Sequence, residues 1–530
     1  MKKGFKMGGL RLLAGLLSIL FILFVSQYLF CIPLNWHSAG FICELLLIGV
    51  IIYLSLFSIK LTGTGKKKVS AVLWIPLVLL AIFLIAVLGG TPITGGLHNY
   101  RNQSVIDESD FSSIPQFDAT QVQLVDKNTA QQLGDRVFGT LGSDEVSQYQ
   151  IGSDWVQISL NGRLCRVTPI DFGGLYRYFA TRTTPGYIIV DCYSGEAKLV
   201  RSEGMSYMKS AYFSHNLQRH LFFADPFAIY GESKFELDDS GKPYWVTPVY
   251  EVTWVAKTRD VKGVRILDPV NGQSVYYAKD EVPSWVDNVY PISVIYDQFR
   301  QSKRYENGLF NWAKKGVVEF TDDYAYVQFN GNVHIYTGVT SVGKDESNVG
   351  FAYVDLRNGK ISYIRRAGAE EYSARSSAEG ALQQYHYTAI FPSMVNVADR
   401  PTYFMGLVDG ANLIKSYAFV SYENYQLVAT GQTVDEAYRN YLKLVAGDET
   451  VPYELNEVEF EVDEVSSIVK EGNSIVLLKN ADGEIFWYTM ADGDYRASFI
   501  NKGDTVKANI DEEGRIREFL AILVKNDASE

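Results

Sequence analysis

Three apolar runs open the chain, at residues 12–30, 41–59 and 71–88. Each run has 18 or 19 residues, close to the roughly 20 that a helix needs to cross a bilayer. The single charged residue within them is Glu44, and a charge at the centre of a membrane helix costs about 2.5–3.5 kcal/mol. The pattern therefore predicts three transmembrane helices, with the lipid bilayer as the partner of residues 12–88.

The basic residues around these runs predict their orientation. Four precede the first run, four lie at 60–68, and residues 31–40 have none; they are Lys2, Lys3, Lys6, Arg11, Lys60, Lys66, Lys67 and Lys68. Because basic loops stay in the cytoplasm, we expect a multi-pass protein of the cell membrane with a cytoplasmic N-terminus. Residues 91–530 are then extracytoplasmic. Glu44 would lie near the outer surface, where we expect water to hydrate it.

Beyond residue 90 the apolar runs give way to capped helices and short alternating strands. Residues 91–115 are rich in Gly, Ser, Asn and Asp without a clear period, and they are predicted to be a linker. Three later segments begin with a capping box and continue with helical apolar spacing, at 129–141, 376–385 and 433–445. Alternating segments joined by Asn-Gly or Asp-Gly predict antiparallel hairpins around them. We expect a first α+β unit at 116–250, and a second and third at 251–450.

One hairpin pattern occurs three times in this region. In each copy an apolar run ends in Asp-x-x-Ser/Asn-Gly and a second alternating run follows; the turn residues are Asp191 and Gly195, Asp268 and Gly272, and Asp355 and Gly359. An aspartate side chain accepts hydrogen bonds from the turn backbone, and glycine tolerates a positive φ. These six residues are predicted to be structural.

The order of helix and hairpin, with this turn, resembles the PepSY domain. PepSY-like modules are small extracytoplasmic α+β units found beside membrane helices, and the resemblance implies a link to peptidase inhibition or envelope regulation. The units here recur at 77 and 87 residues, longer than the family's usual module. The chain as a whole is also similar to multi-helix envelope proteins of Gram-positive bacteria, a likeness that implies no activity.

The last part of the chain, residues 456–530, is predicted to be a separate domain. It contains five short alternating segments joined by turn residues, with a Lys502-Gly503-Asp504 corner. That number of strands is typical of a small closed β-barrel of the OB type. The predicted fold class is α+β: three N-terminal transmembrane helices at 1–90, repeated helix-plus-antiparallel-sheet (PepSY-like) units, and a small C-terminal OB-like β-barrel.

Charge and composition narrow the possible partners. Residues 91–530 carry 41 basic and 60 acidic residues, a net charge of −19, which would repel nucleic acid and anionic lipid headgroups. We therefore expect no nucleic-acid partner and a protein partner in the cell envelope. Aromatic residues make up 14% of the chain, which favours sheet-rich folds.

Candidate catalytic chemistry is sparse. The four cysteines, Cys31, Cys43, Cys165 and Cys192, exclude a disulfide-dense fold and a cysteine-rich zinc site. Three roles stay open for Cys192: strand packing beside the turn aspartate, a disulfide to Cys165, and a catalytic Cys–His pair. The six histidines are scattered without an H-E-x-x-H motif, and the sequence has no G-x-S-x-G elbow. No metal site, cofactor or catalytic residue is predicted.

The clearest candidate binding region is the loop before the third hairpin and the segment after it. The loop 338–350 holds Lys344, Asp345, Glu346, Ser347 and Asn348, and Glu370 and Glu371 lie shortly downstream. Binding groups concentrate on polar loops supported by a sheet, although an ordinary surface loop fits the same pattern. We predict ligand or partner contact at these seven residues.

These features favour a membrane-anchored extracytoplasmic binding or scaffold protein of the cell envelope that is not an enzyme. An envelope hydrolase with its site near residues 338–375 is the first alternative. An accessory subunit of a membrane transport complex, with the three helices as its interaction surface, is the second. A pocket where a carboxylate, histidine or serine of 338–375 meets a second titratable group would favour the hydrolase.

Overall fold

The computed structural model describes residues 2–61, 69–119, 123–329, 331–342, 348–446, 456–470, 473–490, 495–510 and 514–524. The chain divides into two units, Met1–Tyr441 and Leu442–Glu530. The described residues contain 26 strands in five sheets. The protein is therefore a mixed α+β chain.

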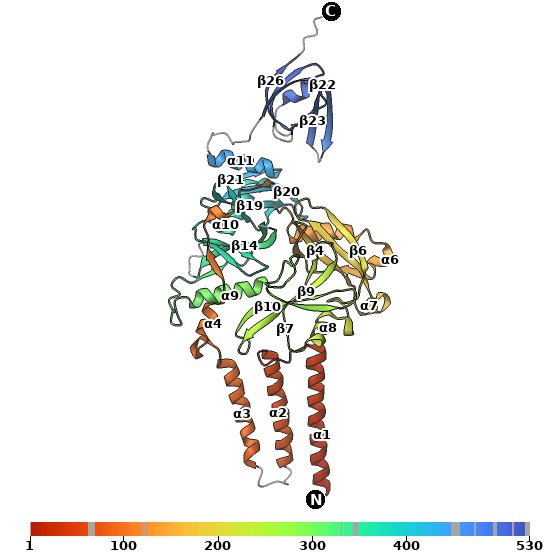
Figure 1. The fold of residues 1–530 in the computed structure, drawn as a ribbon, viewed down its shortest axis with the longest axis vertical. Helices are drawn as coiled ribbons and strands as arrows, with labels where there is room; N and C mark the ends of the chain where they lie inside the picture. The colour runs from red at the N-terminus through yellow and green to blue at the C-terminus, as the bar shows by residue number, and fades with distance from the viewer. Residues whose placement is uncertain are drawn as a thin grey trace, which may run out of the picture. The chain divides into compact units, whose positions relative to one another are not determined.

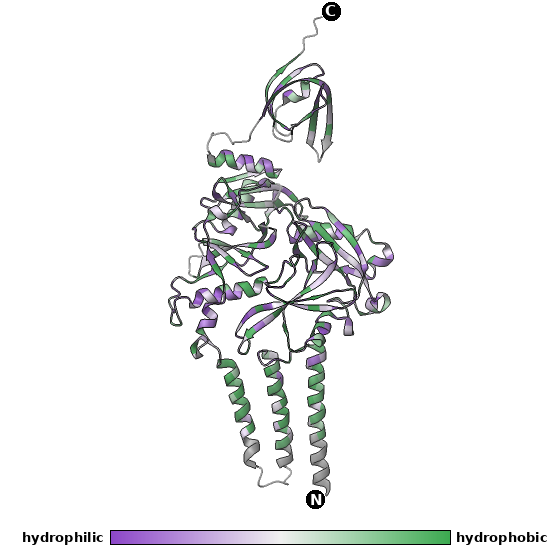
Figure 2. Ribbon diagram, viewed as in Figure 1, coloured by the Kyte–Doolittle hydropathy of each residue, from purple (hydrophilic) through white to green (hydrophobic). Residues whose placement is uncertain are grey.

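Three helices begin the first unit, each packed against the next (Figure 1). They are α1 (Lys2–Phe24), α2 (Ala39–Leu61) and α3 (Val69–Leu88), and α1 continues into a π-helical turn, Val25–Leu29. Figure 2 shows that hydrophobic residues dominate the described parts of all three. Large apolar side chains such as Phe21 and Ile85 lie 67% and 60% exposed on them.

The prediction of three membrane-spanning helices is wrong. Among the described residues one helix segment, Ala39–Phe57, is long and apolar enough to cross a membrane. The apolar stretches of the other two helices are shorter, at Leu13–Leu29 and Trp74–Leu88. At 1.5 Å per residue, stretches of this length span about 22–26 Å, less than the roughly 30 Å of a hydrocarbon core. The loop lysines Lys66, Lys67 and Lys68 lie outside the described residues.

Glu44 on α2 is buried between helices rather than hydrated. Ser26 Oγ donates a hydrogen bond to Glu44 Oε1 at 2.5 Å, and Gln27 Nε2 donates to Oε2 at 3.1 Å. Both donors belong to the π-helical turn, a geometry that re-aims side chains relative to an α-helix. The expectation of a solvated Glu44 is therefore wrong, because neighbouring side chains replace the water.

The first sheet of the folded part has the order β2-β4-β5-β6, with β3 paired to β4. Helix α5 (Lys127–Phe138) packs on its strands β5 and β6, and two short helices, α6 and α7, flank it. The bounds are β2 (Tyr149–Ile151), β3 (Val156–Leu160), β4 (Arg163–Phe172), β5 (Thr184–Asp191), β6 (Ala197–Met205), α6 (Ser143–Val146) and α7 (Leu175–Thr181).

The second sheet has the order β11-β10-β9-β7, with β8 paired to β9. Its long β9–β10 hairpin ends at Trp254 and Ala256, which both adopt a positive φ. The bounds are α8 (Leu217–Ala224), β7 (Ile229–Tyr230), β8 (Lys234–Leu237), β9 (Pro243–Thr253), β10 (Thr258–Leu267) and β11 (Ser274–Ala278).

The third sheet has the order β1-β16-β15-β14-β12, with β13 paired to β14. Strand β1 lies inside the predicted linker 91–115 and pairs in parallel with β16, which follows it by more than 250 residues. The bounds are α4 (Leu97–Arg101), β1 (Ile106–Glu108), α9 (Ile292–Tyr305), β12 (Val318–Phe320), β13 (Ala325–Phe329), β14 (Asn332–Ser341), β15 (Asn348–Asp355) and β16 (Ile361–Ile364).

The fourth sheet has the order β17-β19-β20-β21, with β18 paired to β19. Helix α10 packs across β19, β20 and β21. The bounds are α10 (Glu371–Ala381), β17 (Thr388–Ala389), β18 (Ser393–Val397), β19 (Arg400–Val408), β20 (Ile414–Ser421), β21 (Val428–Gly431) and α11 (Val434–Ala446).

The three repeated turns share one geometry. The amides of Tyr193, Val270 and Arg357 donate to Oδ1 of Asp191, Asp268 and Asp355 at 2.9, 2.8 and 2.8 Å, in that order. The glycine amide four residues after each aspartate donates to its carbonyl at 2.9 Å. The φ angles of Gly195, Gly272 and Gly359 are 71°, 75° and 72°. Each turn therefore uses its aspartate as an acceptor and its glycine in the left-handed region.

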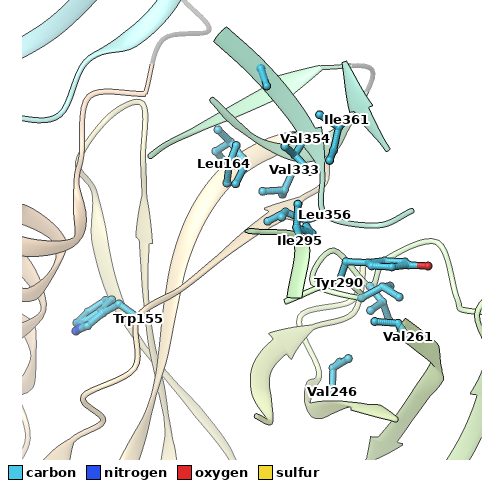
Figure 3. Close-up of a cluster of buried hydrophobic side chains, with 14 of the residues drawn as sticks. Trp155, Leu164, Val246, Val261, Tyr290, Ile295, Val333, Val354, Leu356 and Ile361 are labelled. Carbon is cyan, nitrogen blue, oxygen red and sulfur yellow. The ribbon is translucent and has the colours of Figure 1, made fainter. Parts of the chain in front are cut away.

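The hairpin units do not have separate cores. One hydrophobic cluster contains Leu164 of β4, Val246 of β9 and Val354 of β15, all at most 1% exposed, so it joins three sheets (Figure 3). Tyr290, just before α9, and Ile295, in its first turn, belong to the same cluster. The first three sheets are therefore held together by apolar burial that no single unit supplies.

The helix ends are tied to the second sheet and α8. Trp254 Nε1 donates to the carbonyl of Ile85 at 3.2 Å, and a Cβ on Gly89 would lie 2.1 Å from that nitrogen. His37 Nδ1 lies 2.7 Å from the carbonyl oxygen of Trp254. Arg219 of α8 donates to the carbonyl of Tyr28 at 2.7 Å. The π-helical turn after α1, the loop before α2 and the end of α3 thus contact the folded part directly.

The second unit contains the fifth sheet, in the order β24-β23-β22-β25-β26. The predicted closed barrel is wrong, because among the described residues no ladder of hydrogen bonds joins the outer strands β24 and β26. A single isolated bridge connects Trp487 of β24 to Arg515, the residue before β26. A strand count cannot distinguish an open sheet from a closed one, because closure depends on pairing of the edges. The bounds are β22 (Asn456–Lys470), β23 (Asn473–Asn480), β24 (Ile485–Thr489), β25 (Thr505–Ile510) and β26 (Ile516–Leu523).

Candidate functional site

Glu371, the first residue of α10, is a buried carboxyl group at the wall of a cavity. It is 5% exposed. Tyr336 Oη donates to its Oε1 at 2.9 Å, and Asn348 Nδ2 donates to its Oε2 at 3.4 Å. Burial raises the pKa of Glu371, and these hydrogen bonds offset that effect only in part. Both carboxyl oxygens are therefore engaged by the protein itself.

A cluster of buried tyrosines supports this carboxyl group. Tyr336, Tyr403 and Tyr422 are all fully buried. Tyr403 Oη donates to the carbonyl of Ala369 at 2.7 Å, and Asn348 Nδ2 lies 3.3 Å from the same hydroxyl oxygen. Burial raises the pKa of Tyr336 and of Tyr403, and the neighbouring Glu371 raises both further. The hydroxyls of Tyr336 and Tyr403 therefore stay protonated and donate hydrogen bonds, to Glu371 and to the carbonyl of Ala369.

The cavity beside Glu371 has a volume of about 770 Å³. Its wall is formed by α9, β12, the end of β14 and the start of α10. Groups of both charges line it: Arg300, Lys314, Arg375, Glu319, Asp322, Asp323, Glu370 and Glu371. One hydrogen-bond donor of Arg375 is already used, since its Nε donates to the carbonyl of Ala389 at 3.1 Å. A polar wall of mixed sign suits a ligand that presents both donors and acceptors.

A second cavity, of about 510 Å³, shares Asp323 and Phe391 with the first. Asp154 is on its wall and forms ion pairs with Lys209 at 3.2 Å and Lys234 at 3.3 Å. Burial alone would raise the pKa of Asp154, but the two lysines outweigh it and hold the pKa below its usual range. Asp154 is therefore ionised and neutralised by its neighbours.

A pair of buried acids lies away from these residues, between the first two sheets. Glu236 of β8 accepts the amides of Asp287 and Asn288 at 2.8 and 3.1 Å, and Asp287 accepts the amide of Ser159 at 2.6 Å. Burial raises the pKa of Glu236 to about 7, although the amide hydrogen bonds lower it. Burial and the adjacent Glu236 raise the pKa of Asp287. The pair satisfies three backbone donors from two segments, which is a structural task.

The structure brings together some of the predicted binding residues. Asn348, Glu370 and Glu371 meet at the first cavity or directly behind its wall. Asn348 is not a loop residue but the first residue of β15, 1% exposed. The loop residues Lys344, Asp345, Glu346 and Ser347 lie outside the described residues.

The sequence interpretation missed Tyr336, Tyr403 and Arg166. The tyrosines occupy ordinary apolar positions of strands, so nothing local distinguishes them. Arg166 carries a signal, because it is a charged residue directly between the apolar residues Cys165 and Val167 of β4. A buried charge in a strand interior indicates a partner that the sequence does not name.

The cysteines are not bridged. Cys165 and Cys192 are both buried and free, and Gln157 Nε2 lies 3.2 Å from Cys192 Sγ. Burial raises the pKa of Cys165 to about 12 and that of Cys192 to about 11. A thiol needs its thiolate form to act as a nucleophile, so this environment opposes a catalytic role. Among the described residues, no group of three or more His, Cys, Asp or Glu side chains could hold a metal ion.

Comparisons with known proteins do not assign a family to this chain. No family model matches the chain, and no curated protein matches it. A solved structure of a B. megaterium levansucrase mutant has a TM-score of 0.17 and 8% sequence identity, covering 78% of this chain and 99% of that chain. A likeness at this TM-score carries no argument about fold or function.

Proposed function

We propose that this chain is a membrane-attached extracytoplasmic protein of the cell envelope that binds or scaffolds a protein partner and is not an enzyme. The observation that carries the proposal is the cavity of about 770 Å³ at the start of α10, with Glu371 at its wall. Its lining offers cations, carboxylates and the 74% exposed ring of Tyr372. These are the groups that recognise a polar peptide segment.

The state of Glu371 supports binding rather than hydrolysis. A general base or nucleophile needs a free oxygen within reach of the substrate, whereas both oxygens of Glu371 accept hydrogen bonds from buried groups. The nearest titratable partner, Tyr336, is fully buried and its pKa is raised. A carboxyl group fixed by these hydrogen bonds instead stiffens the wall of a binding cavity.

The proposed location follows from the N-terminal helices. Helix α2 contains a segment that is long and apolar enough to cross a membrane, and the first eleven residues carry Lys2, Lys3, Lys6 and Arg11. With this basic tail in the cytoplasm, one crossing at α2 places the folded part outside the membrane. Extraction of isolated membranes with alkaline carbonate should leave the chain in the pellet. Protease added to intact cells should digest the folded part, and protection until lysis would contradict this location.

Photo-crosslinking in living cells tests the partner proposal. A photo-reactive phenylalanine analogue replaces Tyr372, which lines the cavity, or Tyr385, which is 57% exposed after the end of α10 and outside the lining. We expect a discrete protein adduct from position 372 and none from position 385. Equal adducts at both positions, or no adduct at 372 with full expression, would contradict a partner in this cavity.

A further inference from the structure

Arg166 is a buried cation without an acceptor. It lies on β4 and is 5% exposed. Among the described residues its guanidinium makes no hydrogen bond, and its Nε is shielded from solvent without a partner. Its one ring contact is with Tyr326, whose centroid lies 5.3 Å from Cζ. Gln157, directly opposite on β3, also has an unpaired side-chain oxygen, and the two groups do not pair.

This arrangement is unfavourable for the empty protein. A guanidinium stays charged at all relevant pH values and has five N–H donors. Its burial without a hydrogen-bonded counter-charge is strongly destabilising. A ring contact compensates a cation only in part. Arg166 lines the second cavity, of about 510 Å³, so a ligand within that cavity can supply the missing acceptor.

Several of the other charges on the cavity wall already have partners. Lys234 pairs with Asp154 at 3.3 Å and with Glu232 at 3.3 Å. Asp126 caps α5 by accepting the amide of Thr129 at 2.7 Å. Lys127 also lines the cavity but is exposed to solvent, so Arg166 is the buried cation of this wall with donors open for a ligand.

The remaining wall selects the type of anion. Aromatic rings face the same cavity: Trp155, Tyr324, Tyr326, Phe391 and Phe404. Such walls bind a flat or apolar body. The carboxylates of Asp126 and Asp323 on the same lining would repel a doubly charged phosphate more strongly than a singly charged anion. A singly charged carboxylate matches the planar fork of one guanidinium.

We propose that the second cavity binds an organic monocarboxylate with an aromatic or apolar body, with the carboxylate held by Arg166. The carboxylate belongs either to a free acid or to the C-terminus of a short peptide. This site is distinct from the partner cavity beside Glu371 and does not depend on it. The ligand neutralises a charge that the fold itself leaves unpaired.

Titration calorimetry on the full chain in detergent tests the proposal. The probes are N-acetyl-phenylalanine, its amide N-acetyl-phenylalaninamide, and a short acetylated peptide ending in phenylalanine. We expect saturable binding of the acid and binding of the amide weaker by about 10- to 100-fold, the range for a hydrogen bond to a charged group. If the peptide binds more tightly than the free acid, the carboxylate source is a chain end; the reverse order indicates a free acid. Equal binding of acid and amide, or no saturation by any probe, would overturn the proposal.

Variants of Arg166 separate binding from folding. Arg166→Met should abolish acid binding, and Arg166→Lys should weaken it by at least about tenfold because the fork is lost. Arg163→Met is the matched control, since Arg163 lies on the same strand, is exposed, and pairs with Asp191 at 2.8 Å. That control should bind as the wild type does. Unchanged binding in Arg166→Met would refute the site.

Thermal unfolding gives a second readout. Without ligand, Arg166→Met should unfold at the same temperature as the wild type or higher, because it removes an unpaired buried charge. The acid should raise the Tm of the wild type and leave that of Arg166→Met unchanged. A Tm several degrees lower in Arg166→Met, restored in Arg166→Lys, would show a structural cation and overturn the proposal. If Arg166→Met does not fold, the comparison of acid with amide on Arg166→Lys decides.

Discussion

The hydroxyl of Tyr336 donates a 2.9 Å hydrogen bond to Oε1 of Glu371 in a region closed to solvent. Tyr336 comes from the middle of β14 and Glu371 from the first turn of α10. A Cβ on Gly338, two residues after the tyrosine, would lie 2.3 Å from the same Oε1. The glycine therefore leaves the space that lets the helix start against the strand.

Glu371→Ala should destabilise the first unit by about 1–3 kcal/mol, because Tyr336 and Asn348 lose a buried acceptor. Glu371→Gln keeps one acceptor oxygen and nearly the same volume, so it should cost less. Urea unfolding followed by near-UV circular dichroism measures both. A larger loss in the glutamine variant would mean that Glu371 is ionised in the folded protein.

Stability should fall as the pH rises from about 4.5 to about 7. Burial raises the pKa of Glu236 to about 7 in the folded protein, from 4.5. Folding thus favours the protonated form; its contribution is complete below the unfolded pKa and is lost as the pH rises through the folded pKa. Such a shift corresponds to about 3 kcal/mol.

The pH profile of Glu236→Gln checks this assignment. The variant should flatten the fall in unfolding free energy between about pH 4.5 and 7. A residual slope is expected, because burial also raises the pKa of Asp287 and of Glu371. Glu203→Gln, at an exposed position, should keep the wild-type profile. Parallel profiles for wild type and Glu236→Gln would show that the buried acid pair is not the source.

Alanine substitution should have different effects at two of the turn glycines, Gly195 and Gly359. Each has a positive φ, so alanine costs about 1–2 kcal/mol at any of them. At Gly195 an added Cβ meets no atom closer than 3.8 Å, whereas at Gly359 it lies 2.8 Å from the ring of Tyr290. Gly359→Ala should therefore lower the midpoint of thermal unfolding more than Gly195→Ala. Equal losses would indicate that Tyr290 moves aside without cost.

Reducing agents should not change the stability of the protein. Cys165 and Cys192 are free, and burial raises both thiol pKa values. Mass spectrometry after alkylation should find both labelled in urea and neither labelled in the native state. A linked peptide containing both residues, lost on reduction, would contradict the free state.

Local sequence patterns were sufficient to predict the geometry of the three repeated turns. Each turn spans five residues, from the aspartate at 191, 268 or 355 to the glycine four positions later. Its hydrogen bonds close within those five residues. Such geometry depends on near neighbours, so a single sequence contains it. The same holds for the Asp126 cap of α5, one residue before the helix, although the sequence pattern placed that start at Thr129.

The binding region was predictable only in part. The polar residues at 348, 370 and 371 indicated the part of the chain that forms the cavity beside Glu371. The tyrosines that hold Glu371 come from strands 35 positions before and 32 after it. Their hydroxyls became relevant only when the third and fourth sheets buried them together.

The sequence by itself determined an apolar N-terminal region, an α+β composition and three aspartate–glycine turns, because these follow from residue type and spacing over a few positions. The tertiary structure alone decided that β1 joins β16 and that three hairpin units share one core. It also decided that, within the described part of the chain, the last sheet stays open and Arg166 has no acceptor. These properties depend on pairings between distant segments, and neither hydropathy nor spacing encodes which surfaces will meet.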